Sequence, residues 1–228
     1  MPAVFVTATG TDIGKTFVTA GLVRHLRATG QEATAIKPVV SGYDLAAAEQ
    51  SDPGLLLAAM KRPATADQIA RISPWRFSTP LSPDMAARRE NRGIDFRSLV
   101  DFCREAMESH ETLLIEGVGG IMVPLDDRHT VLDWISALRL PLLLVAGSYV
   151  GTISHTLTAL NVLARRNLTT LAVVLSETPG SAAPLDETAA TIGRFSDLIE
   201  VVTLPRMAVP SENHAVFARL ATLLQSAG

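Results

Sequence analysis

TATGTDIGKT, residues 7–16, is the most informative segment of this 228-residue chain. It follows the short aliphatic run 3–6 and precedes a segment with the apolar spacing of a helix. A strand, a glycine-containing turn and a helix, in that order, are the setting in which a Gly-Lys-Thr ending forms a phosphate-binding loop. The backbone NH groups of Gly10, Thr11, Asp12, Ile13, Gly14, Lys15 and Thr16 would then bind the phosphates of a nucleoside triphosphate.

Two side chains of this loop are candidates for direct contact with the phosphates and their metal ion. Lys15 would supply a mobile positive charge, and Thr16 would place its hydroxyl on a Mg²⁺ that bridges the β and γ phosphates. The usual pattern has glycine where Thr9 stands, so we expect Gly10 to supply the positive φ angle. The alternative is an ordinary strand-to-helix turn that happens to contain a lysine.

The composition predicts a globular α/β protein with small-molecule partners. Hydrophobic residues make up 47% of the chain and aromatic residues 5%, and the length fits one domain over residues 1–228. The net charge of −3, without a run of Lys or Arg, argues against nucleic acid and anionic membranes as partners. Because Cys103 is the only cysteine and no apolar stretch approaches the ~20 residues of a membrane helix, we expect a cytoplasmic protein with Cys103 in its core.

Apolar runs without alternation recur along the chain and predict strands that are buried on both faces. Helical patterns lie between them, for example at 16–29 and 95–109, so the strands should be parallel. We therefore predict an α/β fold with a single-domain, doubly wound, mostly parallel sheet of the P-loop NTPase type and helices on both faces. The predicted strands span residues 4–7, 32–36, 112–115, 142–146, 171–175 and 199–204.

Residues 41–93 interrupt this alternation of strands and helices. They contain no convincing strand pattern, and the prolines spread along them predict short helices and ordered loops. A long insertion on a rigid sheet commonly carries function, so we expect it to contribute to the active site. The prolines of this segment are Pro53, Pro63, Pro74, Pro80 and Pro83.

Three further clusters follow the second, third and fourth predicted strands, namely KPVVSG at 37–42, EGVGG at 116–120 and GTISH at 151–155. Since the carboxyl ends of parallel strands lie at one edge of a sheet, we expect all of them to face one crevice with the phosphate loop. Glu116 is a candidate ligand of Mg²⁺ or of a positioned water, although a surface turn could also contain it. Lys37 alone could be a solvated lysine at a strand end.

These four motifs, in this order, resemble the patterns TGTGTDVGKT, KPVxSG, EGAGG and GTINHT of the dethiobiotin synthetase family. FSTPLSP, residues 77–83, also resembles a family segment, so the similarity spans nearly the whole chain. It implies that CO₂ and 7,8-diaminopelargonic acid are joined and closed into a ureido ring, with ATP as co-substrate. In this reaction an amine captures CO₂ as a carbamate, ATP phosphorylates the carbamate, and the second amine displaces phosphate.

The resemblance also implies roles for individual residues. Lys15, Lys37 and Thr11 would be catalytic around the γ phosphate, and Asp52 would join Thr16 and Glu116 as a magnesium ligand. Asp52 precedes Pro53, however, so it equally fits a helix N-cap. The family's contacts place a homodimer interface near Gly151. The pattern of histidines is more consistent with His155 in a structural role or near the substrate than with zinc binding. The implied substrate-binding residues are Lys37, Ser41, Ser82, Gly117, Gly151, Thr152, Ile153 and Ser154.

The chain departs from the family pattern mainly on the side of the nucleobase. Ser176 stands where the family has an asparagine that reads adenine, and Ser154 also replaces an asparagine. Pro205 and Arg206, the other predicted base contacts, follow Val202 where the family has glycine. Serine offers fewer and shorter hydrogen bonds than asparagine, so we expect weaker discrimination between bases.

Three other functions are compatible with a phosphate loop on such a sheet. A ParA- or MinD-like ATPase that binds a protein partner would carry a lysine where Gly10 stands. A cobyrinic-acid-type amide synthetase would add a glutaminase domain, for which the chain is too short. A binding protein without turnover would not need Lys15, Thr16, Lys37, Asp52 and Glu116 together.

Overall fold

The computed structural model describes residues 3–211 and 213–226. In this part of the chain, six strands form one parallel sheet in the order β2-β5-β1-β6-β7-β8. Each predicted strand is confirmed, and its ends differ from the prediction by one residue at most. The strands are β1 (Val4–Ala8), β2 (Ala33–Ile36), β5 (Thr112–Glu116), β6 (Leu142–Gly147), β7 (Thr170–Ser176) and β8 (Glu200–Leu204).

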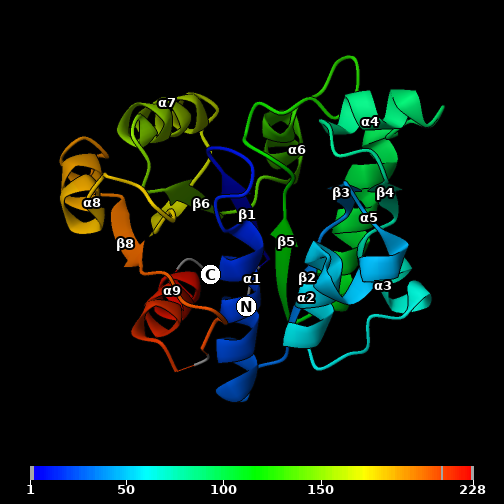
Figure 1. Ribbon diagram of the computed structural model, residues 1–228, viewed down its shortest axis with the longest axis horizontal. Coiled ribbons are helices and arrows are strands. Elements are labelled where there is room, and N and C mark those ends of the chain that lie inside the picture. Colours follow the sequence, from blue (N-terminus) through cyan, green and yellow to red (C-terminus); the bar gives the residue numbers. More distant parts are fainter. Residues whose placement is uncertain (1–2, 212, 227–228) are drawn as a thin grey trace.

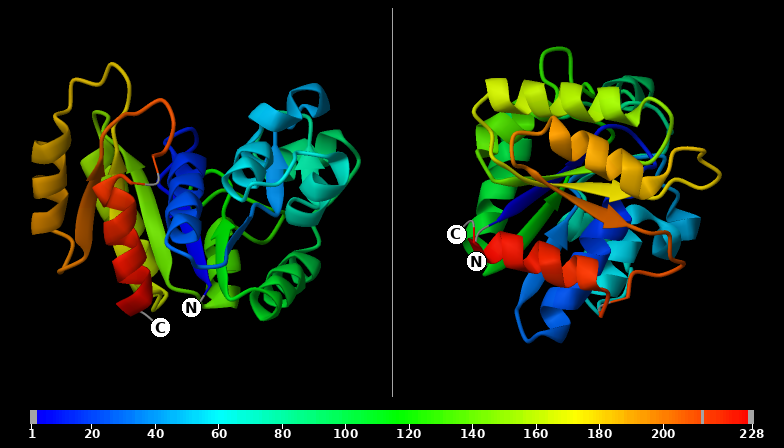
Figure 2. Two further views of the ribbon diagram at one scale, coloured as in Figure 1. Left: turned by 90° about the horizontal axis from the view of Figure 1, so that it is seen from below. Right: turned by 90° about the vertical axis from the view of Figure 1, so that its left-hand side faces the viewer.

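Helices cover both faces of this sheet (Figure 1). The helices α1 (Lys15–Ala28) and α9 (Ala215–Ser226) lie side by side on one face, and α7 (Thr152–Arg165) and α8 (Leu185–Arg194) lie on the other (Figure 2). The predicted helices at 16–29 and 95–109 are α1 and α5 (Phe96–Ser109). Within the described residues, every helix is too short or too polar to span a membrane.

Residues 41–93 contain the expected short helices but also a strand, so the prediction of no strand there was wrong. The strand β4 (Trp75–Phe77) pairs in parallel with β3 (Val39–Ser41) in a small second sheet. Three residues are too few to show a strand period, and the pairing depends on packing, such as the edge-on contact of Trp75 with Phe102 of α5. The helical elements are η1 (Leu45–Gln50), α2 (Asp52–Ala59), α3 (Ala66–Ile72) and α4 (Pro83–Arg89).

The strand order determines which loops meet. β1 pairs with β5 on one side and β6 on the other, and β2 lies beyond β5. Glu116 is opposite Val6 of β1, and Ile36, the last residue of β2, is opposite Ile115. The segments that follow β2, β5 and β1 therefore emerge at one level and side by side.

The packing of α1 against α9 requires glycine at position 21. A Cβ atom at Gly21 would overlap the ring of Phe217, which is fully buried. We predict that Gly21→Ala lowers the free energy of unfolding by about 2 kcal/mol, because overpacking outweighs the ~1 kcal/mol that alanine gains in a helix. Urea unfolding followed by circular dichroism measures this difference.

Gly193 of α8 is the matched control for Gly21. A Cβ atom there would lie 4.0 Å from Val201, an ordinary contact. Gly193→Ala should leave stability unchanged or raise it by up to about 1 kcal/mol. Equal effects of the two substitutions would show that α1 and α9 do not pack as described.

Candidate active site

The loop between β1 and α1 leaves the amino end of α1 open. Gly14, the N-cap residue, has a φ of 103°, and no side chain among the described residues caps the helix. The uncapped NH groups of the first turn are therefore available to an anion. The expectation that Gly10 has a positive φ was wrong, because the left-handed positions of the loop are Asp12 (56°) and Gly14.

The loop after β5 packs directly on the phosphate loop, and its glycines make this possible. Gly119 has a φ of 59°, and a Cβ atom there would lie 2.6 Å from Val123. A Cβ atom at Gly120 would lie 3.1 Å from the carbonyl oxygen of Thr9. The close approach of the two backbones holds Glu116, at the start of this loop, beside the amino end of α1.

Two carboxylates and one ammonium group form the charged centre of the site. The Nζ atom of Lys37 lies 2.6 Å from Oδ2 of Asp52 and 2.6 Å from Oε1 of Glu116. The hydroxyl of Thr16 donates to the same Oε1 atom at 2.6 Å. The side chains of Lys37 and Glu116 are 4% and 0% exposed, whereas that of Asp52 is 43% exposed. The charged centre is thus shielded from solvent at Glu116 and open to solvent at Asp52.

The electrostatics of this centre keep Lys37 charged. Burial lowers the pKa of Lys37, but the adjacent Glu116 and Asp52 carboxylates outweigh it, so the pKa lies above its usual value. Burial raises the pKa of Asp52, and the Lys37 ammonium more than reverses this, so the pKa lies below its usual value. For Lys15, burial and the positive charge of Lys37 lower the pKa to about 8.

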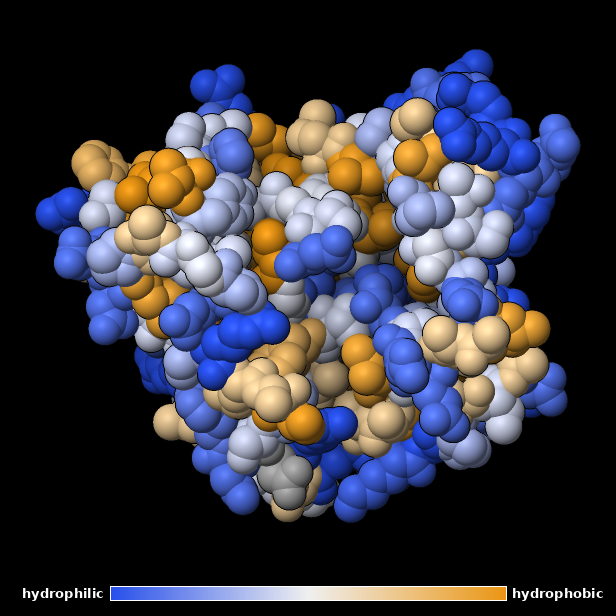
Figure 3. Space-filling model, in the orientation of Figure 1, coloured by the Kyte–Doolittle hydropathy of each residue, from blue (hydrophilic) through white to orange (hydrophobic). Residues whose placement is uncertain are grey.

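Lys15 and Lys37 line one cavity of about 310 Å³ at the end of the sheet. Lys15 Nζ donates to the carbonyl oxygen of Gly10 at 3.0 Å. Figure 3 shows the surface hollowed near the middle of this face, with hydrophilic residues inside the hollow. Of the individually predicted residues, Thr11, Asp12, Gly14, Lys15, Thr16, Lys37, Ser41 and Asp52 line the cavity. Val40, Val118 and Gly119 come from the two clusters expected to face it, and Phe17 was not anticipated.

The oxygen atoms around this cavity suit a magnesium ion. Glu116 Oε2 is buried and has no hydrogen-bond partner among the described residues, and Thr16 and Asp52 offer further oxygens nearby. Mg²⁺ prefers oxygen ligands and is commonly held by one or two carboxylates together with phosphates and water. The interpretation of Asp52 as a helix cap was wrong, because Ser51 caps α2 and Asp52 is the first helical residue.

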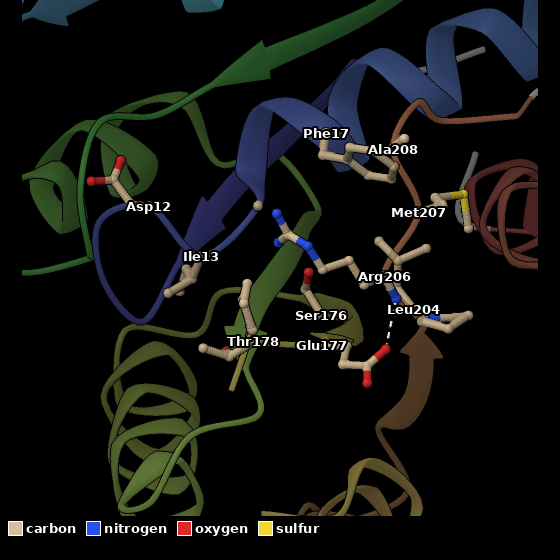
Figure 4. A pocket seen from close by; sticks show the side chains of 13 residues that line it. Asp12, Ile13, Phe17, Ser176, Glu177, Thr178, Leu204, Arg206, Met207 and Ala208 are labelled. Carbon is tan, nitrogen blue, oxygen red and sulfur yellow. Dashed lines mark hydrogen bonds between the residues drawn. The ribbon is translucent and has the colours of Figure 1, made fainter. Parts of the chain in front are cut away.

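A second cavity, of about 480 Å³, shares Asp12, Gly14 and Phe17 with the first. Figure 4 shows the side chains that line it. Its lining includes Ser176 and Arg206, and the guanidinium group of Arg206 points toward the Ser176 hydroxyl. Oε2 of Glu177 accepts a hydrogen bond from the backbone NH of Arg206 at 2.8 Å, which fixes the chain after β8 against the chain after β7. The predicted residues Asp12, Ile13, Gly14, Ser176, Pro205 and Arg206 meet here, with Phe17, Glu177, Thr178, Leu204 and Met207 not anticipated.

Six of the predicted substrate residues, Gly117 among them, line neither of these cavities. Ser82 precedes α4 and donates to Asp84 at 2.5 Å. Gly151 is the N-cap of α7 with a φ of 98°, and Thr152, Ile153 and Ser154 begin that helix. These residues do not line the charged cavity, because β6 adjoins β1 on the side away from β5 and β2, but His155 of the same cluster lines a groove with the phosphate loop.

Gly117 and His155 have other surroundings. The NH of Gly117 donates to the carbonyl oxygen of Val6 at 2.9 Å, and a Cβ atom there would lie 2.9 Å from Phe5. Nδ1 of His155 lies 2.8 Å from the Tyr149 hydroxyl. His155 also lines a mainly apolar groove of about 510 Å³ between α7, the phosphate loop and residues 120–124.

Comparison with known proteins agrees with this geometry. A family model described as an AAA domain matches residues 2–219. The ATP-dependent dethiobiotin synthetase BioD of Acidiphilium cryptum is 50% identical over 186 residues, which are 81% of this chain and 83% of that protein. The BioD proteins of Methylobacterium nodulans (48% identity, 86% and 90% coverage) and Phenylobacterium zucineum (42%, 97% and 94%) are similar over even more of the chain.

Solved structures show the same fold at low sequence identity. The cell division ATPase MinD of Pyrococcus furiosus has a TM-score of 0.58 at 16% identity, with both chains covered in full. MinD of Aquifex aeolicus has a TM-score of 0.59 at 12% identity, with 99% and 98% coverage. These structures share only the fold, whereas the extensive sequence identity shows that the chain belongs to the ATP-dependent dethiobiotin synthetase family.

Proposed function

We propose that this protein uses Mg²⁺ and ATP to join CO₂ to 7,8-diaminopelargonic acid and to close the ureido ring of dethiobiotin. The observation that carries the proposal is that Lys15, Lys37 and Asp52 line one cavity beside an uncapped helix end, with the buried carboxylate of Glu116 in contact with Lys37 behind it. Phosphoryl transfer needs positioned positive charge rather than a side-chain nucleophile, and this cavity provides it.

The reaction would proceed in three bond-making steps. An amine of the substrate attacks CO₂ and loses a proton to give a carbamate. A carbamate oxygen then attacks the γ phosphorus, ADP leaves, and a carbamic-phosphoric anhydride forms. The second amine attacks the carbonyl carbon and loses a proton, phosphate leaves with the bonding electron pair, and the ring closes.

The residues of the chain would hold the anions of these steps. The NH groups of the loop up to Thr16 would bind the phosphates, and Lys15 and Lys37 would stabilise charge on the transferring group. Ser41 would donate to the carbamate, and Thr11 lies at the same cavity. Thr16, Asp52 and Glu116 would hold Mg²⁺, which neutralises phosphate charge when bound.

We also propose that residues 1–228 work as one domain and that the insertion 41–93 completes the active site. Ser41 and Asp52 both belong to this insertion and both line the charged cavity. The insertion is anchored to the sheet, since the Lys37 NH donates to the Ile72 carbonyl oxygen at 3.0 Å.

The decisive experiment measures phosphate release from Mg-ATP in the presence of bicarbonate, with and without the diamine. We expect release only with the diamine, together with a product that has the mass of dethiobiotin. A MinD-like ATPase would instead hydrolyse ATP without the diamine and respond to a protein partner. The identity of 42–50% to dethiobiotin synthetases, and Gly10 in place of a lysine, favour the first outcome.

We predict that this protein discriminates weakly between nucleobases. Ser176 and Arg206 line the second cavity, and the short Ser176 hydroxyl offers little to distinguish one base edge from another. The kcat/KM values for CTP and GTP should lie within about tenfold of that for ATP, a difference of one hydrogen bond. Ser176→Asn should increase the preference for ATP. A strong preference for ATP in the unsubstituted protein would contradict the prediction.

We further propose that the protein is a homodimer through the face that contains the apolar groove and α7. Met122, which lines the groove, is 58% exposed, and the region above the central hollow in Figure 3 is rich in apolar residues. Light scattering should give a dimer mass, and Met122→Glu should shift it toward monomer. Leu198→Glu, at a fully exposed position outside the groove, is the control and should leave the mass unchanged.

A further inference from the structure

Lys37 contacts the two carboxylates that a magnesium ion would also need, although Oε2 of Glu116 has no partner among the described residues. Its Nζ atom lies 2.6 Å from carboxylate oxygens of both Asp52 and Glu116, and the second of these oxygens also accepts from Thr16. These three residues are the oxygen donors proposed above for Mg²⁺. An ammonium group and a divalent cation repel each other, so each weakens the binding of the other to this carboxylate pair.

The charges at the buried centre of the site balance without a metal ion, because Lys15 and Lys37 offset Asp52 and Glu116. Asp12, which is exposed, adds one more negative charge to the cavity lining. A divalent cation that binds before any phosphate would therefore leave an excess of positive charge at this centre. When a metal ion arrives together with a polyphosphate, the polyphosphate supplies negative charge. Lys37 can then pair with the polyphosphate once the ammonium group has left the carboxylates.

The backbone around Lys37 is fixed, so an exchange of partners has to take place in the side chain. The NH of Lys37 donates to Ile72, and the carbonyl oxygen of Pro38 accepts from Trp75 at 3.0 Å. The ion pair of Lys37 with Asp52 is open to solvent at Asp52, whose side chain is 43% exposed. Lys37 lines the same cavity as Lys15. A cation can therefore reach the carboxylates from the cavity while the ammonium group turns toward the phosphate loop.

We infer that Lys37 and the divalent cation are alternative partners of Asp52 and Glu116, and that metal binding releases the Lys37 ammonium to the phosphoryl group. The inference rests on the proposed function. It makes Lys37 an internal counter-ion that keeps the metal site weak until nucleotide arrives. It also couples the catalytic ammonium to the metal, so that ATP without metal leaves Lys37 on the carboxylates.

The first test measures Mn²⁺ binding to nucleotide-free protein by electron paramagnetic resonance. We expect Lys37→Met to bind Mn²⁺ about tenfold more tightly than the unsubstituted protein, because a competing charge is removed. Lys15→Met removes one positive charge from the same cavity but keeps Lys37 in contact with the two carboxylates. The increase in Mn²⁺ affinity should therefore be several-fold smaller in this variant. Equal gains in the two variants, or no gain in Lys37→Met, would overturn the inference.

The second test needs no substitution, because the chain has only three lysines, Lys15, Lys37 and Lys61. The ammonium groups of ¹⁵N-labelled lysine are followed by NMR with ADP and a chelator, and then with ADP and Mg²⁺. We expect the Lys37 resonance to move only when Mg²⁺ is added, while that of the exposed Lys61 stays in place. A Lys37 resonance that moves fully with ADP alone, or that ignores Mg²⁺, would refute the exchange.

These measurements are independent of turnover. If the exchange occurs but the diamine does not stimulate phosphate release, the proposed function fails and the coupling of lysine and metal stands. If the diamine stimulates release and the Lys37 resonance does not respond to Mg²⁺, only the inference fails.

Discussion

Lys37→Ala is expected to lower kcat for diamine-dependent phosphate release by about a thousandfold, the scale on which a positioned electrostatic group acts in the transition state. The affinity for ATP should fall much less, because the loop NH groups and Lys15 still bind the phosphates. Comparison of kcat with the dissociation constant of ATP measures the two effects separately. Equal losses in both would place Lys37 in ordinary ground-state binding.

This substitution also leaves the buried carboxylate of Glu116 without its closest positive charge. Removal of one partner of a buried pair commonly costs 3–5 kcal/mol, roughly, so the variant should be assayed only where unfolding curves show that it is folded. Lys61→Ala is the control, because Lys61 is exposed after α2 and lines neither cavity. It should change neither stability nor turnover.

Glu116→Gln is expected to lower kcat by about a hundredfold and to raise the magnesium concentration needed for half-maximal activity. Glutamine keeps the shape of the side chain and removes the charge that faces both Lys37 and Thr16. Phosphate release measured over a series of magnesium concentrations gives both quantities. An unchanged magnesium dependence would mean that Glu116 does not take part in holding the metal.

Glu111→Gln is the matched control for this variant. Glu111 directly precedes β5, and Glu116 is the last residue of that strand. Glu111 is exposed and lies at the opposite end of the strand from Glu116. The same change of charge on the same strand should leave both kcat and the magnesium dependence unaltered.

Much of the fold was predictable because buried parallel strands appear in the sequence as aliphatic runs of four to seven residues. Each of the six runs is a strand of the sheet. The sequence did not reveal β4, because a three-residue strand has no measurable period and its partner β3 lies more than thirty residues earlier. The sequence also did not reveal that Asp12 has a positive φ, because this conformation is usual for glycine and the path of the loop imposes it here on a non-glycine residue.

The candidate site was predictable only in part, for a topological reason. Motifs at the ends of β1, β2 and β5 converge, because these strands are neighbours in the sheet. GTISH follows β6, on the other side of β1, and this depends on strand order rather than on any residue of the motif. Glu177 and Met207 adjoin predicted residues in the sequence. They reach the second cavity because the segments after β7 and β8 are held together, with the Arg206 NH donating to Glu177.

Gly14 belongs to the walls of both cavities, and a Cβ atom on it would lie 2.9 Å from the hydroxyl oxygen of Ser176. Any larger side chain here would push on Ser176, the proposed base contact, and would also strain the turn proposed to bind the triphosphate. Attempts to re-engineer this protein for another nucleotide should therefore leave position 14 unchanged and start at Ser176 and Arg206, which line only the second cavity.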